Sequence, residues 1–264
     1  MSRIFQFKYV FNKNKYNKSI IHFYCFFNLF MINNQESYYT DVDKMHVATD
    51  CIVFGFHQDE LKLLIFNRRV QPHKGGWSLI GSFVKLNEDV DHAAKRVLRD
   101  ITGLDNVFFE QSRTYGNAER DMGARCVSVA QFALIRIDEY DEELTEMRGA
   151  FWYRLEELPE LVLDHYQMVI DALDILRRKA KHQPIGFELL PEKFTIPQLQ
   201  SLYEAIFQRK LDPGNFRKKI LSFKILNRLN EKDRSSSKRG AFYYTFDHDT
   251  YEKLLKSGYN FDFL

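Results

Sequence analysis

The sequence predicts an α/β (α+β) fold in two parts, a larger mixed region at residues 45–183 and a smaller one at residues 184–264. Strand-like and helix-like patterns alternate up to Pro184, as expected of a layered α/β structure. Beyond Pro184, two short amphipathic helices precede two strands. The sign of the net charge also changes at Pro184. Residues 45–183 contain 18 basic and 23 acidic residues, whereas residues 184–264 contain 14 basic and 10 acidic residues.

In the larger part, apolar patterning places each element. Alternating apolar residues predict strands at 47–56 and 62–66, joined by a hairpin at Gln58-Asp59. Apolar side chains at three- and four-residue steps from Val90 to Ile101 predict an amphipathic helix, with Asn87 as its N-cap. The other expected elements are strands at 77–80, 108–115, 125–137 and 151–154 and a long helix at 164–181.

The smaller part has the order helix, turn, helix, hairpin. Thr195 is the expected N-cap of a first helix that extends to Gln208. Asp212 caps a second helix, which Pro213 opens. Two strands between Arg228 and Phe246 flank a charged, serine-rich tip, and a short helix at 251–256 follows.

Residues 1–44 stand apart from both parts. We interpret them as a non-native or disordered N-terminal extension, with Met31 as a possible native start, because residues 1–30 contain no acidic residue and have the composition of AT-rich codons. Their apolar run is shorter than the ~20 residues that a membrane span needs. The three cysteines are widely spaced, which excludes a disulfide scaffold. We therefore expect a cytoplasmic protein with no membrane partner.

The segment from Gly81 to Leu104 resembles the Nudix box, G-x5-E-x7-R-E-U-x-E-E-x-G-U, where U is a bulky apolar residue. Alignment on Arg96 puts Ser82 at the first glycine, beside Gly81, and Glu88 at the first acidic position. The resemblance extends over residues 45–183 and implies a Nudix α/β/α sandwich with a mixed sheet. It also implies that Glu88 and Arg96 pair. The retained or adjacent box positions are Gly81, Glu88, Arg96, Asp100 and Gly103.

Three glutamates of the box helix hold divalent metal in the active family. Here Val97, Asp100 and Ile101 occupy those positions, and Val and Ile supply no oxygen ligand. One remaining carboxylate cannot assemble a metal-bridged phosphoryl site. We therefore predict that the chain is no enzyme and uses no metal and no cofactor.

The segment from Arg209 to Thr245 is similar to the winged helix-turn-helix of the Nudix-related transcriptional regulators. The resemblance rests on Lys210-Leu211-Asp212, on Asn215-Phe216-Arg217-Lys218-Lys219, and on Arg239-Gly240 followed by aromatic residues. Eleven basic and three acidic residues lie between Arg209 and Arg239. Such a run alone is more typical of a solvated helix face, but together with the helix-turn-helix order and the wing it favours a double-stranded DNA operator as partner. The candidate DNA-binding residues are Asn215, Arg217, Lys218, Lys219, Ser222, Lys224, Arg234, Lys238 and Arg239.

Members of this family sense either nucleotide-derived ligands such as ADP-ribose or simple sugars. The chain looks most similar to the Bacteroides-type branch that responds to L-arabinose, which implies a repressor of sugar-utilisation genes with a small sugar effector. Loops over the sheet offer donors and acceptors for such a ligand. The candidate ligand-binding residues are Arg68, Lys74, Trp77, Arg113, Tyr115, Glu119 and Asp121.

Alternatives remain open at this stage. Trp77 is equally well explained as a core residue, and Arg68, Arg69 and Lys74 as solvated charges or phosphate binders. The whole chain is alternatively a Nudix hydrolase, an ADP-ribose-sensing regulator of NAD metabolism, or a protein-interaction module. DNA half-sites favour a homodimer. Its interface would include Tyr166, Met168 and Ile175, for which core packing is the alternative.

Overall fold

The computed structural model describes residues 40–57, 59–105, 107–137, 146–234, 240–259 and 261. Met45–Leu264 form one compact unit, distinct from Met1–Lys44. Two expectations lie outside the described residues: the start at Met31, and the hairpin tip with Lys238 and Arg239. Within the described residues, no helix combines the length and the apolar character needed to cross a bilayer.

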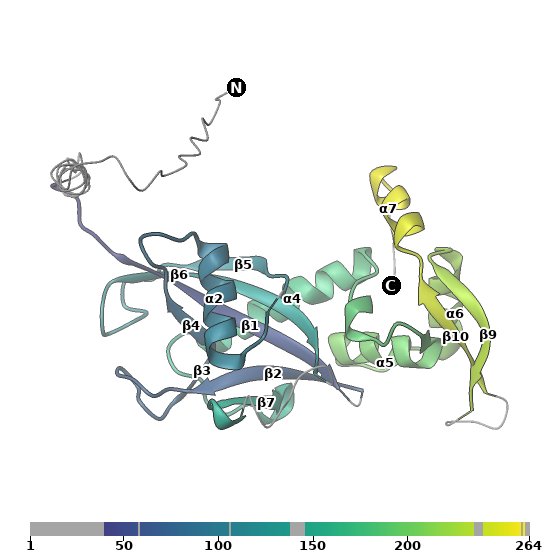
Figure 1. The fold of residues 1–264 in the computed structure, drawn as a ribbon, viewed down its shortest axis with the longest axis horizontal. Helices are drawn as coiled ribbons and strands as arrows, with labels where there is room; N and C mark the ends of the chain where they lie inside the picture. The colour runs from purple at the N-terminus through teal and green to yellow at the C-terminus, as the bar shows by residue number, and fades with distance from the viewer. Residues whose placement is uncertain are drawn as a thin grey trace, which may run out of the picture. The chain divides into compact units, whose positions relative to one another are not determined.

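A mixed sheet forms the centre of the larger part (Figure 1). The strands follow the order β3-β2-β1-β6-β5, while β4 pairs with β1 and β7 pairs with β2. The β1–β6 ladder is parallel, while the other described ladders of this sheet are antiparallel, which confirms the predicted mixed sheet. The strands are β1 (His46–His57), β2 (Glu60–Asn67), β3 (Trp77–Ser78), β4 (Ile80–Phe83), β5 (Glu110–Tyr115), β6 (Cys126–Arg136) and β7 (Ala150–Arg154).

One helix covers each face of this sheet (Figure 1). On one face, helix α2 (Val90–Thr102) buries Ala94, Val97 and Leu98 in an apolar cluster with β1, β2 and β4. On the other face, helix α4 (His165–His182) buries Met168, Ala172 and Leu176. Met168 is therefore a core residue rather than part of an exposed interface.

The start of α2 differs from the expectation. Asp89, not Asn87, is the N-cap, because its Oδ1 accepts a hydrogen bond from the backbone N–H of His92 at 2.8 Å. Glu88 meanwhile accepts from the backbone N–H of Lys85 at 2.9 Å, so the preceding residues form a turn of their own. Gly103 ends the helix as predicted, with a left-handed φ of 83°.

The smaller part has the predicted winged helix order. Helix α5 (Ile196–Phe207) begins with a capping box between Thr195 and Gln198, and helix α6 (Pro213–Ser222) begins at the N-cap Asp212. Strands β9 (Leu226–Asp233) and β10 (Ala241–Phe246) form the hairpin, and β8 (Phe194–Thr195) pairs with β10. The described remainder comprises helix α7 (His248–Lys256) and the 3-10 turns η2 (Leu155–Glu157) and η3 (Phe187–Leu189).

The apolar core does not stop at Pro184. The cluster on the α4 face of the sheet continues through buried residues of α5 and α6, among them Leu199, Tyr203 and Ile220. Helix α4 therefore packs on the sheet and on the winged helix at once.

Candidate functional site

The three box positions that hold metal in the active family differ in their burial here. Val97 is 2% exposed within the cluster around β1 and β4, and Ile101 packs against the same cluster. The side chain of Asp100 is 56% exposed and lies 3.9 Å from Arg96. Among the described residues, no three His, Cys, Asp or Glu side chains gather closely enough to hold a metal ion.

Glu88 and Arg96 form the pair that the box resemblance implies. Arg96 donates from Nε and Nη2 to the two carboxylate oxygens of Glu88 at 2.8 and 2.6 Å, and also to the carbonyl of Phe83 at 3.2 Å. The hydrogen bonds from Arg96, followed by that from the Lys85 backbone, lower the pKa of Glu88 to about 2. The loop before α2 is thereby fastened to the helix.

The glycine of the box makes room for a buried carboxylate. A Cβ at Gly81 would lie 2.1 Å from Oδ1 of Asp50 and 2.9 Å from the carbonyl oxygen of Thr49. Gly81 and Asp50 are partners in the β1–β4 ladder, so this contact is a consequence of strand register.

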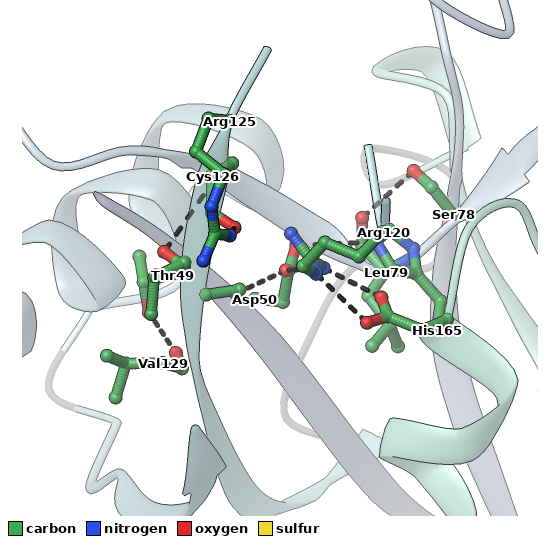
Figure 2. A network of polar contacts seen from close by, with 12 residues as sticks. Thr49, Asp50, Ser78, Leu79, Arg120, Arg125, Cys126, Val129 and His165 are labelled. Atoms are coloured by element: carbon green, nitrogen blue, oxygen red, sulfur yellow. Dashed lines mark hydrogen bonds and ion pairs between the residues drawn. The ribbon is translucent and has the colours of Figure 1, made fainter. Parts of the chain in front are cut away.

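Asp50 is the centre of a buried polar network on β1 (Figure 2). Its Oδ2 accepts a hydrogen bond from Ser128 of β6 at 2.6 Å and lies 3.7 Å from Nη2 of Arg120. Its Oδ1 lies 3.6 Å from Nε2 of His165, the first residue of α4. Three segments distant in sequence therefore converge on one carboxylate.

Arg120 connects this network to the start of α4. Its guanidinium donates from Nε and Nη2 to the two oxygens of Asp164 at 2.9 and 2.7 Å, and its side chain is only 3% exposed. This bidentate geometry is the strongest form of an Arg–carboxylate pair. It fixes the loop between β5 and β6 to the N-terminal end of α4.

His165 is held as a neutral ring. Its Nδ1 accepts a hydrogen bond from the backbone N–H of Leu79 at 3.0 Å, so the proton of the neutral ring is on Nε2, facing Asp50. Burial lowers the pKa of His165 below its ordinary value, outweighing the opposing effect of Asp50.

The structure places six of the seven candidate ligand residues in two groups. In the first, Tyr115 and Arg113 of β5 both donate to Oδ2 of Asp171 on α4, at 2.7 and 3.1 Å. Burial, and then the hydrogen bond to Asp171, raise the pKa of Tyr115. Trp77 belongs to neither group, since its ring packs edge-on against Phe151 and Tyr153 with centroids 5.4 Å away in each case.

The second group lies on two loops that touch. The loop at 68–76 and the loop at 116–125 meet where a Cβ on Gly123 would lie 3.4 Å from Pro72. Arg68 donates from Nε to the carbonyl of Pro72 at 2.9 Å, and Oδ1 of Asp121 accepts from the Gly123 N–H at 2.8 Å. The remaining two candidates, Lys74 and Glu119, are exposed on these loops.

The sequence reasoning missed the residues that hold these loops to α4, namely Asp50, Arg120, Asp164, His165 and Asp171. One signal was available: Asp50 is a single charged residue within an otherwise uncharged strand pattern, where a carboxylate requires a buried partner. Nothing local in the sequence marks Arg120 as that partner.

Helix α6 presents a polar face. Asn215, Arg217, Lys218 and Ser222 are exposed, while Phe216 and Ile220 are buried beneath them. The Ser222 hydroxyl donates to the carbonyl of Lys219 at 2.6 Å. The ammonium of Lys219 lies 5.9 Å from the centroid of the Phe223 ring. Two of the predicted DNA-binding residues, Lys219 and Ser222, therefore also contact residues of α6 or of its C-terminal end.

The hairpin extends the positive surface. Arg234 is exposed at its described end, and Lys224 is exposed in the turn after α6. Arg228 and Lys232 of β9 lie over the ring of Phe242, with their charged groups 4.5 and 4.4 Å from its centroid.

Glu204 organises the turn between α5 and α6. Its carboxylate accepts hydrogen bonds from Nζ of Lys210 at 2.8 Å, from the backbone N–H of Leu211 at 2.9 Å and from Gln200 at 2.9 Å. Partial burial raises the pKa of Glu204, but these hydrogen bonds outweigh it and the net pKa is lowered. The entry to α6 is thus determined by a carboxylate of α5.

A mixed α/β sandwich with a box helix, joined to a winged helix with an exposed basic face, is the architecture of the Nudix-related transcriptional regulators. Comparison with known families supports this class directly. Residues 186–246 match the NrtR DNA-binding winged helix domain, and residues 44–172 match the NUDIX domain.

Individual proteins agree with these matches. The chain is 30% identical over 210 residues to the "ADPR responsive transcriptional repressor NtrR" of Acinetobacter baylyi, covering 78% of this chain and 84% of that protein. It is 26% identical to Shewanella oneidensis NrtR in complex with a 27mer DNA, with a TM-score of 0.69 over 78% of this chain and 95% of that one. An ADP-ribose pyrophosphatase of Methanocaldococcus jannaschii is 29% identical over 130 residues, 49% of this chain and 76% of that protein. The chain belongs to the NrtR family of transcriptional regulators.

The prediction of L-arabinose as effector and of sugar-utilisation genes as targets is wrong. The Acinetobacter baylyi relative, which is similar over most of this chain, is an ADP-ribose responsive repressor. The error has a physical origin. The box and the winged helix motifs, on which the resemblance to the arabinose branch rested, maintain the fold and the DNA interface. Members of the family that sense sugars and members that sense nucleotide-derived ligands share these motifs, so the motifs cannot distinguish a sugar from a nucleotide.

Proposed function

We propose that this protein is a transcriptional repressor that binds operator DNA through its winged helix and senses ADP-ribose through its Nudix domain. This function was the alternative to the sugar-responsive regulator. The observation that carries it is the similarity to the ADP-ribose responsive repressor, which extends through both domains. A regulator of this kind acts on the genome, and we therefore expect it in the cytoplasm.

The exposed face of α6 supports the DNA interaction. Asn215 and Arg217 lie near its N-terminal end, where a recognition helix contacts base edges in the major groove. An arginine there pairs with guanine and an asparagine with adenine. Lys224 and Arg234 are placed outside the helix and contact phosphate in this proposal, as do Lys238 and Arg239 beyond the described residues.

The touching loops at 68–76 and 116–125 are the proposed effector site. ADP-ribose carries a diphosphate, which requires cationic partners, and Arg68 and Lys74 lie on the first loop. Glu119 and Asp121 on the second loop can accept hydrogen bonds from ribose hydroxyls. Arg113 lies on β5, two residues before the strand ends at Tyr115, and its side chain is 67% exposed.

We infer further that the Nudix domain binds without hydrolysing. Support comes from Val97 and Ile101, whose apolar side chains pack in or against the core where the active family holds metal. The similarity to an ADP-ribose pyrophosphatase makes hydrolysis the second candidate function. Incubation with Mg²⁺ and ADP-ribose distinguishes the two, because a hydrolase would release AMP over many turnovers and a sensor would not.

Electrophoretic mobility shift with the upstream DNA of the gene tests the proposal. We expect a specific, salt-sensitive complex that ADP-ribose alters and an unrelated nucleoside diphosphate does not. No specific complex, or a complex indifferent to ADP-ribose, would refute it. Light scattering of the free protein tests the proposed homodimer, for which Tyr166 is the most exposed residue of the three predicted at the interface.

A further inference from the structure

Helix α4 has polar contacts with both functional parts of the chain. At its N-terminal end, Asp164 holds Arg120 of the loop at 116–125. Two turns later, Asp171 accepts from Tyr115 and Arg113 of β5. Lys179 also pairs with Glu110 at the start of β5. The strand and loop that carry proposed effector residues are therefore attached to α4 along most of its length.

Arg177 connects α4 to the winged helix, at the end of α5. Its Nη2 donates to Oε1 of Gln208 at 2.8 Å, and its Nε donates to the backbone carbonyl of Ile206 at 3.2 Å. Its Nη1 lies 3.4 Å from Asp174 of the same helix. Ile206 belongs to the last turn of α5, and Gln208 is the left-handed residue, with φ 51°, that ends α5. A cation at this position satisfies carbonyl groups that a helix terminus leaves free.

This contact is close to the DNA-reading helix. Gln208 is followed by the turn at 209–211, which Glu204 organises, and then by the N-cap Asp212 of α6. The direction in which the chain leaves α5 therefore determines where α6 begins. The side chain of Arg177 is 30% exposed, whereas α4 and α5 share a buried apolar cluster that holds them together without it.

We propose that Arg177 is a positioning residue that couples the effector loop to the DNA-reading helix through α4. Asp164 and Arg177 are separated by about 20 Å along a continuous helix at 1.5 Å per residue. A ligand that favours one position of the Arg120 loop shifts α4 as a body, and Arg177 transfers that shift to the end of α5. The inference rests on the proposed function, since it requires that ADP-ribose and DNA influence one another's binding.

Arg177→Ala tests this role, and Arg178→Ala is the matched control. Arg178 is the same residue type at the next position of α4, is exposed and has no hydrogen bond or ion pair among the described residues. The dissociation constant for DNA is measured with and without ADP-ribose, and that for ADP-ribose with and without DNA. The ratio within each pair is the coupling factor, which must be equal in the two measurements.

We expect the wild-type chain and Arg178→Ala to show the same coupling factor, on the order of tenfold. Arg177→Ala should reduce it to about twofold or less, while each dissociation constant measured alone changes by less than about threefold. Gln208→Ala removes the acceptor from the α5 side and should reduce the factor in the same direction. Gln208→Ala also tests the Arg177–Gln208 contact if Arg177→Ala does not fold.

The outcomes separate the two ideas. If ADP-ribose leaves the DNA affinity of the wild-type chain unchanged, the proposed function is wrong. If the wild type responds to ADP-ribose and both Arg177→Ala and Gln208→Ala respond equally well, the proposed function stands and the coupling role of Arg177 is overturned.

Discussion

Replacement of Arg120 by alanine should be among the most destabilising single changes in the Nudix domain. The substitution removes the bidentate partner of Asp164. It also removes the only cation that lies within 4.0 Å of the Asp50 carboxylate among the described residues, because the nearby His165 is neutral. Asp50 is then a buried carboxylate with the Ser128 hydroxyl as its remaining hydrogen-bond donor. Breaking a buried ion pair from one side costs about 3–5 kcal/mol.

The geometry favours the lower end of that range. Asp164 is 25% exposed and can be rehydrated, and the Arg120–Asp50 separation of 3.7 Å is too long for a hydrogen bond. We therefore expect a loss of ~3 kcal/mol in the free energy of unfolding. Arg154→Ala is the control, because its pair with Glu60 is exposed and such pairs contribute about 0–1 kcal/mol.

Urea unfolding followed by tryptophan fluorescence measures both variants, since Trp77 and Trp152 lie in the sheet. The midpoint of Arg120→Ala should fall by about 1 M or more. Adding Asp50→Asn to Arg120→Ala should recover part of the loss, because it removes the uncompensated charge. If Arg120→Ala costs no more than Arg154→Ala, the network does not stabilise the fold as argued here.

Three further predictions follow from the same structure. Val97→Glu should destabilise the protein by about 3 kcal/mol or more in thermal unfolding, since it buries a carboxylate, whereas Asp100→Glu at an exposed position should be neutral. Arg217→Ala should cost about 1–3 kcal/mol in operator affinity and reduce sequence preference, while Arg234→Ala should weaken operator and random DNA equally and lower the salt dependence. Because burial lowers the pKa of His165 from 6.5, the unfolded chain binds a proton there more readily. The free energy of unfolding should therefore fall as the pH drops below about 6.5, and this slope should be smaller in His165→Gln.

The sequence was sufficient for most of the elements, although the single strand expected at 77–80 is two strands, β3 and β4, and β8 was not expected. Caps such as Thr195 and Asp212 and the stop at Gly103 have local signatures, and the structure places them as expected. The N-cap of α2 was misassigned because Asn87 and Asp89 are both good caps, and the choice depends on the turn that Glu88 makes with Lys85. Residue type alone does not choose between two good N-caps that lie two residues apart.

The candidate site was less predictable. The pairing of Glu88 with Arg96 was inherited from a motif with known geometry, and the structure shows it. The contacts of Arg120 with Asp164 and of Tyr115 with Asp171 join residues 44 and 56 positions apart. Such contacts depend on how α4 crosses the sheet, and a single sequence contains no direct sign of them.

The stacking of Arg228 and Lys232 on Phe242 has a kinetic consequence. A cation that lies over an aromatic ring keeps its full charge, but its side chain has less freedom to rearrange around a phosphate. Their field acts at long range, where it accelerates encounter with a polyanion, and adds little to the lifetime of the bound complex. If the hairpin binds DNA as proposed, Arg228 and Lys232 therefore contribute more to the rate at which the duplex is captured than to the time for which it stays bound.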